Sequence, residues 1–532
     1  MPFQKFLKRY LPFFIPLLVF IVYLPCLRAG FVNWDDNIHV LNNFCFKSPH
    51  GLNLPEIWTS TINNTYIPLT ATTWAIEHCF FGFNPFVFHL DNVLLHLVTV
   101  VLVIIFSRRM GLSAYAAALA GLLFGIHPMH VESVAWVTER KDVLYGVLYM
   151  SALLAYLHYL DTGRKEYFWL TLFLGELSIC AKPMAVSLPF VLLVLDWFRG
   201  RRWTFQTLVE KVFCAAVLVP IAFITYIANS VLVHPALGQG LFIWAWCFMF
   251  YLYKFLFPFP LLLFYGFPQS AAVFYLNVPV FLGFVMALWF YRRNRWFVFA
   301  VSFYFANIFF LLRFSPFLLY VADRFMYLPS VGLCMFFAVS VEKLFFWVKG
   351  RRSNRYSFYM ALCVLLAVMT ALTWRQCEVW QSSVTLWRHQ LKYDSKTAAW
   401  LAYSKLADAY AAADKHLASD ARQFNRVQAL YLKAAELKPD SLYPYLGLGK
   451  LFESAGDFGR AQKYYEQAIL IDHNNFDALF SLGRVFQKRK MPQQAIGFYR
   501  KAMAADPFLC SYVLKPAFLG GLLQEEGVGS RR

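Results

Sequence analysis

The chain contains 532 residues, of which 59% are hydrophobic and only 15% are charged. Soluble domains carry about 25% charged residues, so this composition indicates a membrane protein and excludes an ordinary soluble enzyme. The net charge of +19 would suit a nucleic-acid partner, but the basic residues fall in short clusters between long apolar runs. Nucleic acid is therefore not expected as a partner.

The first apolar run, residues 11–27, follows three basic residues and resembles a signal peptide, but no small-residue cleavage site follows it. We therefore expect an uncleaved first membrane span. A bilayer requires about 20 apolar residues per helix, and later runs predict further spans. These runs are 88–107, 113–126, 141–160, 167–180, 183–198, 209–229, 241–263, 272–291, 296–312, 326–347 and 356–375.

The clusters of Lys and Arg between these runs set the expected topology, because cytoplasmic loops collect basic residues. Alternation is consistent only if 241–263, which contains Pro258 and Pro260, enters and leaves on one side as a re-entrant or interfacial segment. This predicts eleven spans and a cytoplasmic N-terminus. The other side would hold 28–88, 127–140, 230–271, 313–325 and everything after residue 376.

After Trp374 a repeat appears, in which a Leu-Gly pair, two aromatic residues and two alanines recur at a period of 34 residues. This pattern is typical of tetratricopeptide repeats. Small residues let the paired helices approach closely, and they are Gly449, Ala461 and Ala468, then Gly483, Ala495 and Ala502. An earlier unit at 406–439 brings the number to about three, and 511–526 is expected to form a capping helix.

These patterns predict an all-α fold with two domains, a polytopic membrane domain at 1–376 and a tetratricopeptide-repeat α-solenoid at 384–526. The repeats contain no evident catalytic group. They either bind a protein or peptide, which we favour, or only pack against the membrane domain. Cys45 and Cys79 share one polar segment, where a disulfide and two free thiols are equally compatible with the sequence.

Two adjacent acids, Asp35 and Asp36, follow the first span directly. Carboxylates are costly to hold at a membrane surface, so their position hints at a function. One of them could act as a general base on an acceptor hydroxyl, or could hold a divalent cation such as Mg²⁺ or Mn²⁺ beside a phosphate. The alternative is a cap and turn for the next helix, and the residues alone do not decide between these readings.

Further polar residues lie at the ends of apolar runs on the same predicted side of the membrane. The cations among them suit a lipid phosphate, although two could instead pair with Glu139 or Asp142. The candidate phosphate ligands are Arg140, Lys141, Lys182 and Arg324. The supporting residues, which give only a weak metal signal, are His127, His130, Glu132 and Asp323. Acids beside such cations suggest group transfer from a lipid-phosphate donor.

Taken in order, these blocks resemble the transmembrane and tetratricopeptide-repeat O-mannosyltransferases and their bacterial relatives. The resemblance covers nearly the whole chain and is carried by Asn33–Asp36, Tyr66–Thr70, Phe88–Asn92, His127–Trp136, Glu139–Val143 and Asp323–Ser330. The wider group is the C-type glycosyltransferase superfamily of multi-span inverting enzymes, which use polyprenyl-phosphate sugars and carry an acidic motif in the first outer loop. The resemblance implies that Asp35 is the general base and that it activates a Ser or Thr hydroxyl.

The expected activity is therefore transfer of a mannose-like sugar from a polyprenyl-phosphate donor to an extracytoplasmic acceptor, in particular a protein held by the repeats. The short repeat array favours a bacterial inner membrane with periplasmic repeats, and the endoplasmic reticulum is the second choice. The alternative is a non-catalytic membrane scaffold that presents the repeats, which would not need charges at the membrane surface. A transporter would require polar pairs near mid-bilayer and inverted halves, and the sequence contains neither.

Overall fold

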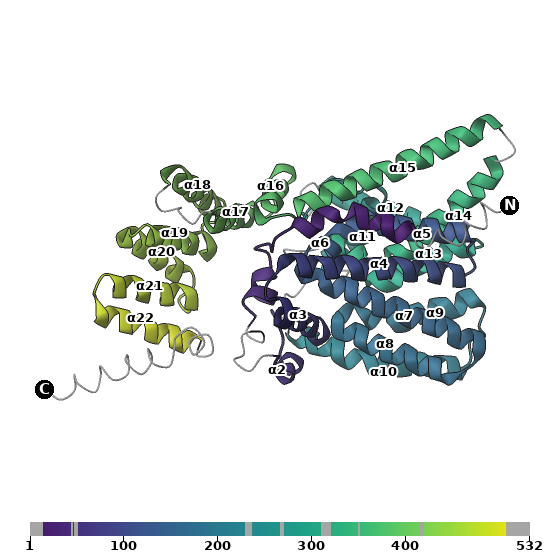
Figure 1. Cartoon of the computed structure of the whole chain (residues 1–532), viewed down its shortest axis with the longest axis horizontal. Helices are drawn as coiled ribbons and strands as arrows, with labels where there is room; N and C mark the ends of the chain where they lie inside the picture. Colours follow the sequence, from purple (N-terminus) through teal and green to yellow (C-terminus); the bar gives the residue numbers. More distant parts are fainter. Residues whose placement is uncertain are drawn as a thin grey trace. The chain divides into compact units, whose positions relative to one another are not determined.

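The computed structural model describes residues 14–43, 46, 52–228, 237–266, 271–309, 321–348, 352–413 and 420–506. Over these ranges the chain is helical, and the one extended pairing is an isolated bridge between Ile62 and Thr65. The predicted all-α fold is confirmed (Figure 1). The chain forms two compact units, residues 1–389 and 390–532. The predicted capping helix at 511–526 and the thiol of Cys45 lie outside the described residues.

The first unit is built around helices that begin and end at loops rich in polar residues. Its α-helices are α2 (Leu54–Thr59), α3 (Pro68–Phe81), α4 (Pro85–Arg109), α5 (Ala114–Gly125), α6 (Val131–Ala135), α7 (Arg140–Thr162), α8 (Lys165–Ala181), α9 (Leu188–Arg199), α10 (Phe205–Ala228), α11 (Leu237–Leu256), α12 (Ala271–Phe290), α13 (Arg295–Ile308), α14 (Ser330–Val348), α15 (Arg352–Val379) and α16 (Ser383–Tyr393). Short helical turns join several of them: η1 (Leu24–Arg28), η4 (Pro128–His130), η5 (Val137–Glu139), η6 (Pro183–Ser187) and η8 (Asp323–Met326).

Several of these helices are long and apolar enough to cross a membrane. Within the described residues there are five, or six if one bent pair counts as a span. The five are Pro85–Arg109, Val137–Thr162, Phe205–Thr225, Ser330–Val348 and Tyr356–Val379. The protein is thus a multi-pass membrane protein, while the number of eleven spans stays a prediction.

The bent pair begins with α5, which coincides with the apolar run predicted at 113–126. Helix α5 ends after 12 residues, and the chain turns by 51° into the segment Pro128–Ala135. Pro128 has no backbone N–H, and its ring disfavours helical backbone at the preceding residue, so a helix cannot run through it undisturbed. The bend carries His130 and Glu132 into a buried position. Part of the predicted outer segment 127–140 is therefore buried and helps to build the candidate site.

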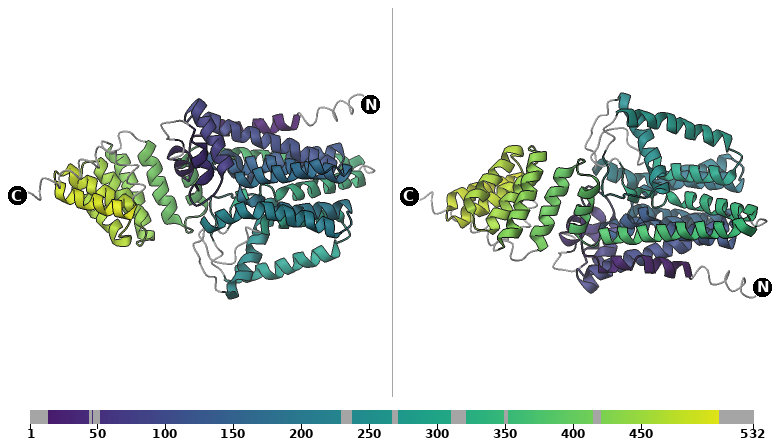
Figure 2. Two further views of the ribbon diagram at one scale, coloured as in Figure 1. Left: turned by 90° about the horizontal axis from the view of Figure 1, so that it is seen from below. Right: turned by 90° about the horizontal axis from the view of Figure 1, so that it is seen from above.

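Helix α11 differs from its neighbours in direction. Figure 2 shows this teal helix running crosswise to the other helices of the first unit. Residues 257–266, which include Pro258 and Pro260, then continue without helix. At the start of α13, Arg295 donates to the carbonyl of Phe198 at the end of α9, so the two basic clusters around these residues lie at one end of the unit. Both observations agree with a segment 241–263 that does not cross the membrane.

Within the described residues, the second unit contains three pairs of antiparallel helices. They are α17 (Ala399–Ala413) with α18 (Ala421–Leu437), α19 (Leu442–Ser454) with α20 (Phe458–Ile471), and α21 (Phe476–Lys488) with α22 (Pro492–Ala505). The expected small residues are buried between paired helices: a Cβ atom on Gly449 would lie 2.4 Å from the Tyr465 ring, and one on Gly483 would lie 2.9 Å from the Tyr499 ring. Three tetratricopeptide-like pairs are therefore present among the described residues.

Candidate functional site

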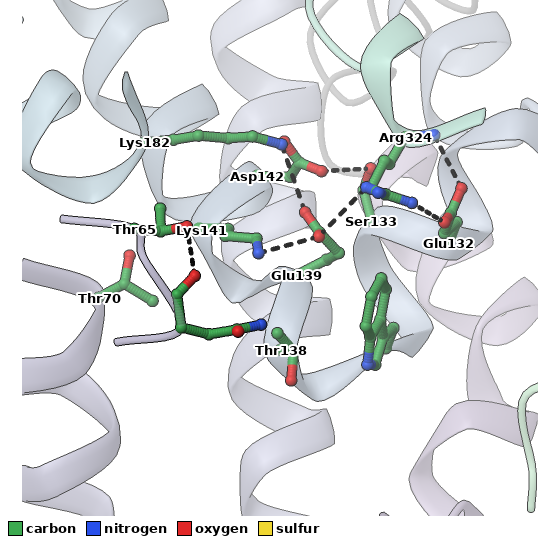
Figure 3. A network of polar contacts seen from close by, with 12 residues as sticks. Thr65, Thr70, Glu132, Ser133, Thr138, Glu139, Lys141, Asp142, Lys182 and Arg324 are labelled. Atoms are coloured by element: carbon green, nitrogen blue, oxygen red, sulfur yellow. Dashed lines mark hydrogen bonds and ion pairs between the residues drawn. The ribbon is translucent and has the colours of Figure 1, made fainter. Parts of the chain in front are cut away.

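A network of charged side chains lies where several loops of the first unit meet, and Glu139 is at its centre. The Glu139 carboxylate is almost fully buried and receives three cations (Figure 3). Lys141 approaches at 3.1 Å, Lys182 at 3.3 Å and Arg324 at 3.3 Å. These cations come from the first turn of α7, from the end of α8 and from η8. We call Glu132, Glu139, Asp142, Lys141, Lys182 and Arg324 the charge network.

Two further carboxylates flank Glu139. Asp142 forms an ion pair with Lys182 and accepts a hydrogen bond of 3.0 Å from Ser133. Glu132 binds Arg324 twice, at 2.5 Å from the guanidinium and at 2.9 Å from the backbone N–H. Three carboxylates thus balance three cations, so each buried charge has an opposite partner, as the low-dielectric surroundings require.

The four predicted phosphate ligands separate into two groups. Lys141 and Arg324 keep 14% and 12% of their side chains exposed, and Lys182 keeps 7%. Arg140, in contrast, is fully buried and lies outside the charge network: it binds Glu77 at 2.6 Å and Asn92 at 2.8 Å. The alternative for these residues, an ion pair with Glu139 or Asp142, is observed for Lys141 but not for Arg140.

Arg140 therefore has the contacts of an anchor. Its guanidinium also donates to the carbonyl of Phe88 at 2.8 Å, and its partner Asn92 donates to the carbonyls of Val134 and Trp136. These bonds attach the segment before α7 to helix α4. They hold the backbone that carries Glu132 and Glu139, while leaving the Arg140 guanidinium without accessible surface for a phosphate.

The two first-loop acids occupy different environments. Asp36 is buried, and its carboxylate accepts hydrogen bonds from the N–H of Val32 at 2.8 Å and from the N–H and hydroxyl of Thr138 at 2.9 and 2.6 Å. Burial raises the pKa of Asp36 to about 7, although these hydrogen bonds act in the opposite direction. Since Thr138 directly precedes Glu139, Asp36 ties the first loop to the charge network.

Asp35 is only half-buried, and its backbone has a φ of +53°. This left-handed conformation is uncommon for residues other than Gly, Asn and Asp, and such positions concentrate at functional sites. Its carbonyl accepts from the N–H groups of Ile38 and His39 at 2.9 and 2.8 Å, which fixes the turn. Asp35 is thus the more accessible of the two acids, as the general-base prediction requires.

The supporting residues have protein partners rather than the geometry of a metal site. His130 bonds the carbonyl of Phe124 at 2.7 Å and the hydroxyl of Ser330 at 2.9 Å, and His127 bonds the carbonyl of Phe255 at 3.0 Å. Asp323 accepts from the Tyr265 hydroxyl at 2.7 Å. Within the described ranges, no three His, Cys, Asp or Glu side chains come together as a metal site requires. The residues present do not fit the possible divalent cation.

Sequence reasoning misses several residues of this site. It offers Glu139 and Asp142 only as ion-pair partners, and it assigns no role to Thr138 or Asn92. The available signal is the run Glu139–Asp142 at the head of an apolar helix, because four successive charged residues there must all find partners. Lys141 pairs with Glu139 inside this run, but Lys182 lies 40 residues from Asp142 and 43 residues from Glu139, which no local pattern encodes.

The fold and this site define a polytopic membrane protein that carries tetratricopeptide repeats and a charge network at one end of its membrane unit. Models of the tetratricopeptide repeat match residues 443–475 and 478–509. The chain is 28% identical over 235 residues to the human protein O-mannosyl-transferase TMTC4, which covers 38% of this chain and 31% of that protein. It is 35% identical over 150 residues to mouse TMTC1, covering 26% of this chain and 16% of that protein.

A third relative is the Drosophila melanogaster protein O-mannosyl-transferase Tmtc2, 32% identical over 199 residues, or 34% of this chain and 21% of that protein. The matched region thus spans about a third or less of each of these relatives. Together with the repeat matches, these relatives confirm the predicted resemblance of the chain to TMTC-like, tetratricopeptide-repeat O-mannosyltransferases.

Proposed function

We propose that the chain is a membrane O-glycosyltransferase that moves a mannose-like sugar from a polyprenyl phosphate to a hydroxyl group of an acceptor protein. The observation that carries this proposal is the hydrogen bonding between Asp36 and Thr138. These bonds attach the first loop, which contains the half-buried Asp35, to the backbone next to Glu139. Three cations converge on the Glu139 carboxylate. The relatives named O-mannosyl-transferases supply the class of reaction.

In this mechanism Asp35 takes the proton of a Ser or Thr hydroxyl as the oxygen attacks the anomeric carbon of the sugar. The bond between that carbon and the phosphate oxygen breaks, and the bonding electron pair leaves with the polyprenyl phosphate. Attack on the side opposite to the leaving group inverts the anomeric configuration. The reaction then requires cations near the phosphate oxygen on which negative charge develops.

Lys141 and Arg324 are the best placed cations for this task, because they retain the largest exposed fractions in the charge network. Both bind Glu139, so a phosphate would take over part of the role that this carboxylate has in the structure. Lys182 is more deeply buried and is paired with Asp142 and Glu139. It would stabilise the same negative charge on the phosphate. We assign Arg140 to positioning of the loop and not to binding of the donor.

The repeats would select the acceptor protein. Helical repeats offer an extended surface for a peptide, and these contain no catalytic group of their own. The relatives' names also specify a protein acceptor. The membrane topology that goes with this function places the charge network and the repeats on the non-cytoplasmic side. We propose a bacterial inner membrane with periplasmic repeats, and the endoplasmic reticulum is the alternative.

The non-catalytic scaffold is a second candidate because all three cations of the charge network are already neutralised by carboxylates, as they would be in a purely structural cluster.

Extracytoplasmic glycoproteins should be compared in cells that contain the gene, lack it, or carry Asp35→Asn. An enzyme predicts that the same O-linked hexose disappears in the last two strains. A scaffold predicts that Asp35→Asn restores whatever the deletion removes.

Topology can be tested separately. A reporter that is active only outside the cytoplasm should be active when fused after residue 376 and silent when fused at 293–296. Activity at both positions would mean that 241–263 crosses the membrane and that it is not a re-entrant or interfacial segment. A silent reporter after residue 376 would remove the proposed placement of the repeats.

A further inference from the structure

A cavity of 600 Å³ lies at the other end of the membrane unit, where α4, α7 and α9 end and α13 begins. Its walls include Tyr159, Gly163 and three arginines, Arg199, Arg201 and Arg295. No carboxylate lines this cavity among the residues that the structure describes. We call it the arginine cavity. The proposed transfer reaction makes no use of it.

The position of the arginine cavity across the membrane follows from helix α7. This helix has the charge network at its first turn and the cavity at its last turn. Its 23 residues rise about 33 Å at 1.5 Å per residue. The hydrocarbon core of a bilayer is about 30 Å thick. The cavity is therefore at the opposite membrane interface, at the level of the phosphates of the lipid headgroups.

Opposite charges around the cavity do not cancel its arginines. Arg199 shares Asp161 with Arg109, and Arg201 binds Glu210 at 2.6 Å. The cations of this cluster are Arg109, Arg199, Arg201, Lys211 and Arg295, and the acids are Asp161, Asp196 and Glu210. Five positive charges against three negative charges leave an excess of two.

Arg295 contributes most to this excess. Its guanidinium donates to the carbonyl of Phe198 and lies 5.2 Å from the Phe198 ring, and it forms no ion pair within the described part of the chain. Arg295 is also the first residue of α13, where Asn294 caps the N–H of Phe297 at 3.3 Å and the helix dipole favours an anion. An anion in the cavity would therefore meet both a guanidinium and a helix N-terminus.

The wall of the cavity is held in place by buried groups. Asp196 and Lys211 are each only 3% exposed, and they form an ion pair of 2.5 Å behind Arg201. Glu210 binds Arg201 through both carboxylate oxygens, at 2.6 and 2.9 Å, and also accepts from the Tyr159 hydroxyl at 2.6 Å. The orientation of Arg201 is thus fixed before any ligand arrives, which lowers the entropic cost of binding.

We propose that the arginine cavity binds the phosphate group of an anionic phospholipid of the leaflet opposite to the charge network. Basic residues at a cytoplasmic membrane interface are expected from topology alone, and Arg292 and Arg293 are exposed examples that do not line the cavity. Basic pockets between membrane helices bind anionic headgroups, and this cavity combines that chemistry with the right depth and a fixed wall.

The test uses the full chain in a non-ionic detergent, titrated with phosphatidylglycerol, phosphatidylcholine or inorganic phosphate, with bound ligand counted by native mass spectrometry. We expect phosphatidylglycerol to bind best. The double variant Arg199→Gln/Arg295→Gln should weaken its binding at least about tenfold, since charge-assisted hydrogen bonds are lost. Arg293→Gln, which removes one charge from the same interface outside the cavity, should change binding less than about twofold.

Three results would overturn the proposal. Equal losses in the cavity variants and in Arg293→Gln would mean that diffuse surface charge attracts the lipid. Equal binding of phosphatidylcholine would remove the anionic preference, and equal binding of inorganic phosphate would identify a site for free phosphate instead of a lipid. If the double variant is unstable to heat, Arg295→Gln alone is used, because this side chain has no carboxylate that would be left unpaired, and Arg295→Lys should retain most of the affinity.

Discussion

The charge network and the tetratricopeptide repeats are held together by different interactions. In the repeats, Tyr431, Tyr465 and Tyr499 follow one another at intervals of 34 residues, and each ring packs on a glycine of the facing helix. In the charge network, three carboxylates and three cations come from segments far apart in the chain and obey no period. The repeats are stabilised by the close fit of aromatic rings against glycines, whereas the charge network is stabilised by close pairing of opposite charges.

This difference determines what a substitution does in each region. In the repeats, an added side chain changes volume, and its cost depends on free space. In the charge network and its attached loop, a change of one charge leaves a buried partner unpaired even when the volume is conserved. Isosteric changes should therefore be severe at one site and mild at the other, which the following experiments can test.

The largest effect is expected for Asp35→Asn. Asn has nearly the same size and tolerates the φ of +53°, so the turn should persist, but the basic carboxylate is lost. Loss of a general base should lower the turnover of sugar transfer about 10²–10⁴-fold, with little change in donor binding. The measurement is transfer from a polyprenyl-phosphate sugar by purified protein. Turnover close to that of the unmodified protein, with the variant folded, would remove Asp35 from catalysis.

In the repeats, Gly483→Arg should cost about 3 kcal/mol of stability, because its Cβ alone would lie 2.9 Å from the Tyr499 ring. If the repeats select the acceptor, protein glycosylation should be lost while hydrolysis of the donor continues. Gly497→Arg in α22 is the matched control, since no atom lies within 4 Å of a Cβ there. Loss of both activities in Gly483→Arg would indicate that the repeats support the membrane unit instead.

The same contrast explains how far the sequence can predict the molecule. A period of 34 residues with small and aromatic positions determines which atoms meet in a repeat, so the packing roles of Gly449 and Gly483 can be assigned from the sequence alone. The site is predictable only in part. Lys182 and Arg324 stand out as charges beside apolar runs, but their partners depend on which loops the fold brings together. For this reason the sequence suggests a phosphate ligand in Arg140, which is an anchor, and gives no central place to Glu139.

A smaller effect is expected for Lys182→Gln. Removing this cation from the charge network should raise the apparent Michaelis constant for the donor about tenfold, as one charge-assisted interaction of roughly 1.5–3 kcal/mol is lost. The single variant also leaves Asp142 and Glu139 short of a partner, so it should be less stable to heat. Lys165→Gln, an exposed change at the other end of α8, is the control and should alter neither property.

The double variant Lys182→Gln/Asp142→Asn separates these two consequences. It restores the balance of charge, so thermal stability should recover, while donor binding should stay weak if Lys182 serves the phosphate. Recovery of both would show that Lys182 only neutralises Asp142.

The last effect concerns pH and the hydrogen bonds between Asp36 in the first loop and Thr138. Burial raises the pKa of Asp36 from 3.8 to about 7 in the folded protein, so between these values the folded state binds more protons than the unfolded state. The contribution of Asp36 to stability is therefore present in full below about pH 4 and is lost as the pH rises through 7. Asp36→Asn cannot titrate and keeps one acceptor for Thr138. The thermal midpoint of the unmodified protein, measured relative to this variant, should decrease as the pH is raised from 4.5 to 8. A difference that is constant with pH would contradict this prediction. It would show that the carboxylate stays ionised in the folded protein, because its three hydrogen-bond donors outweigh its burial.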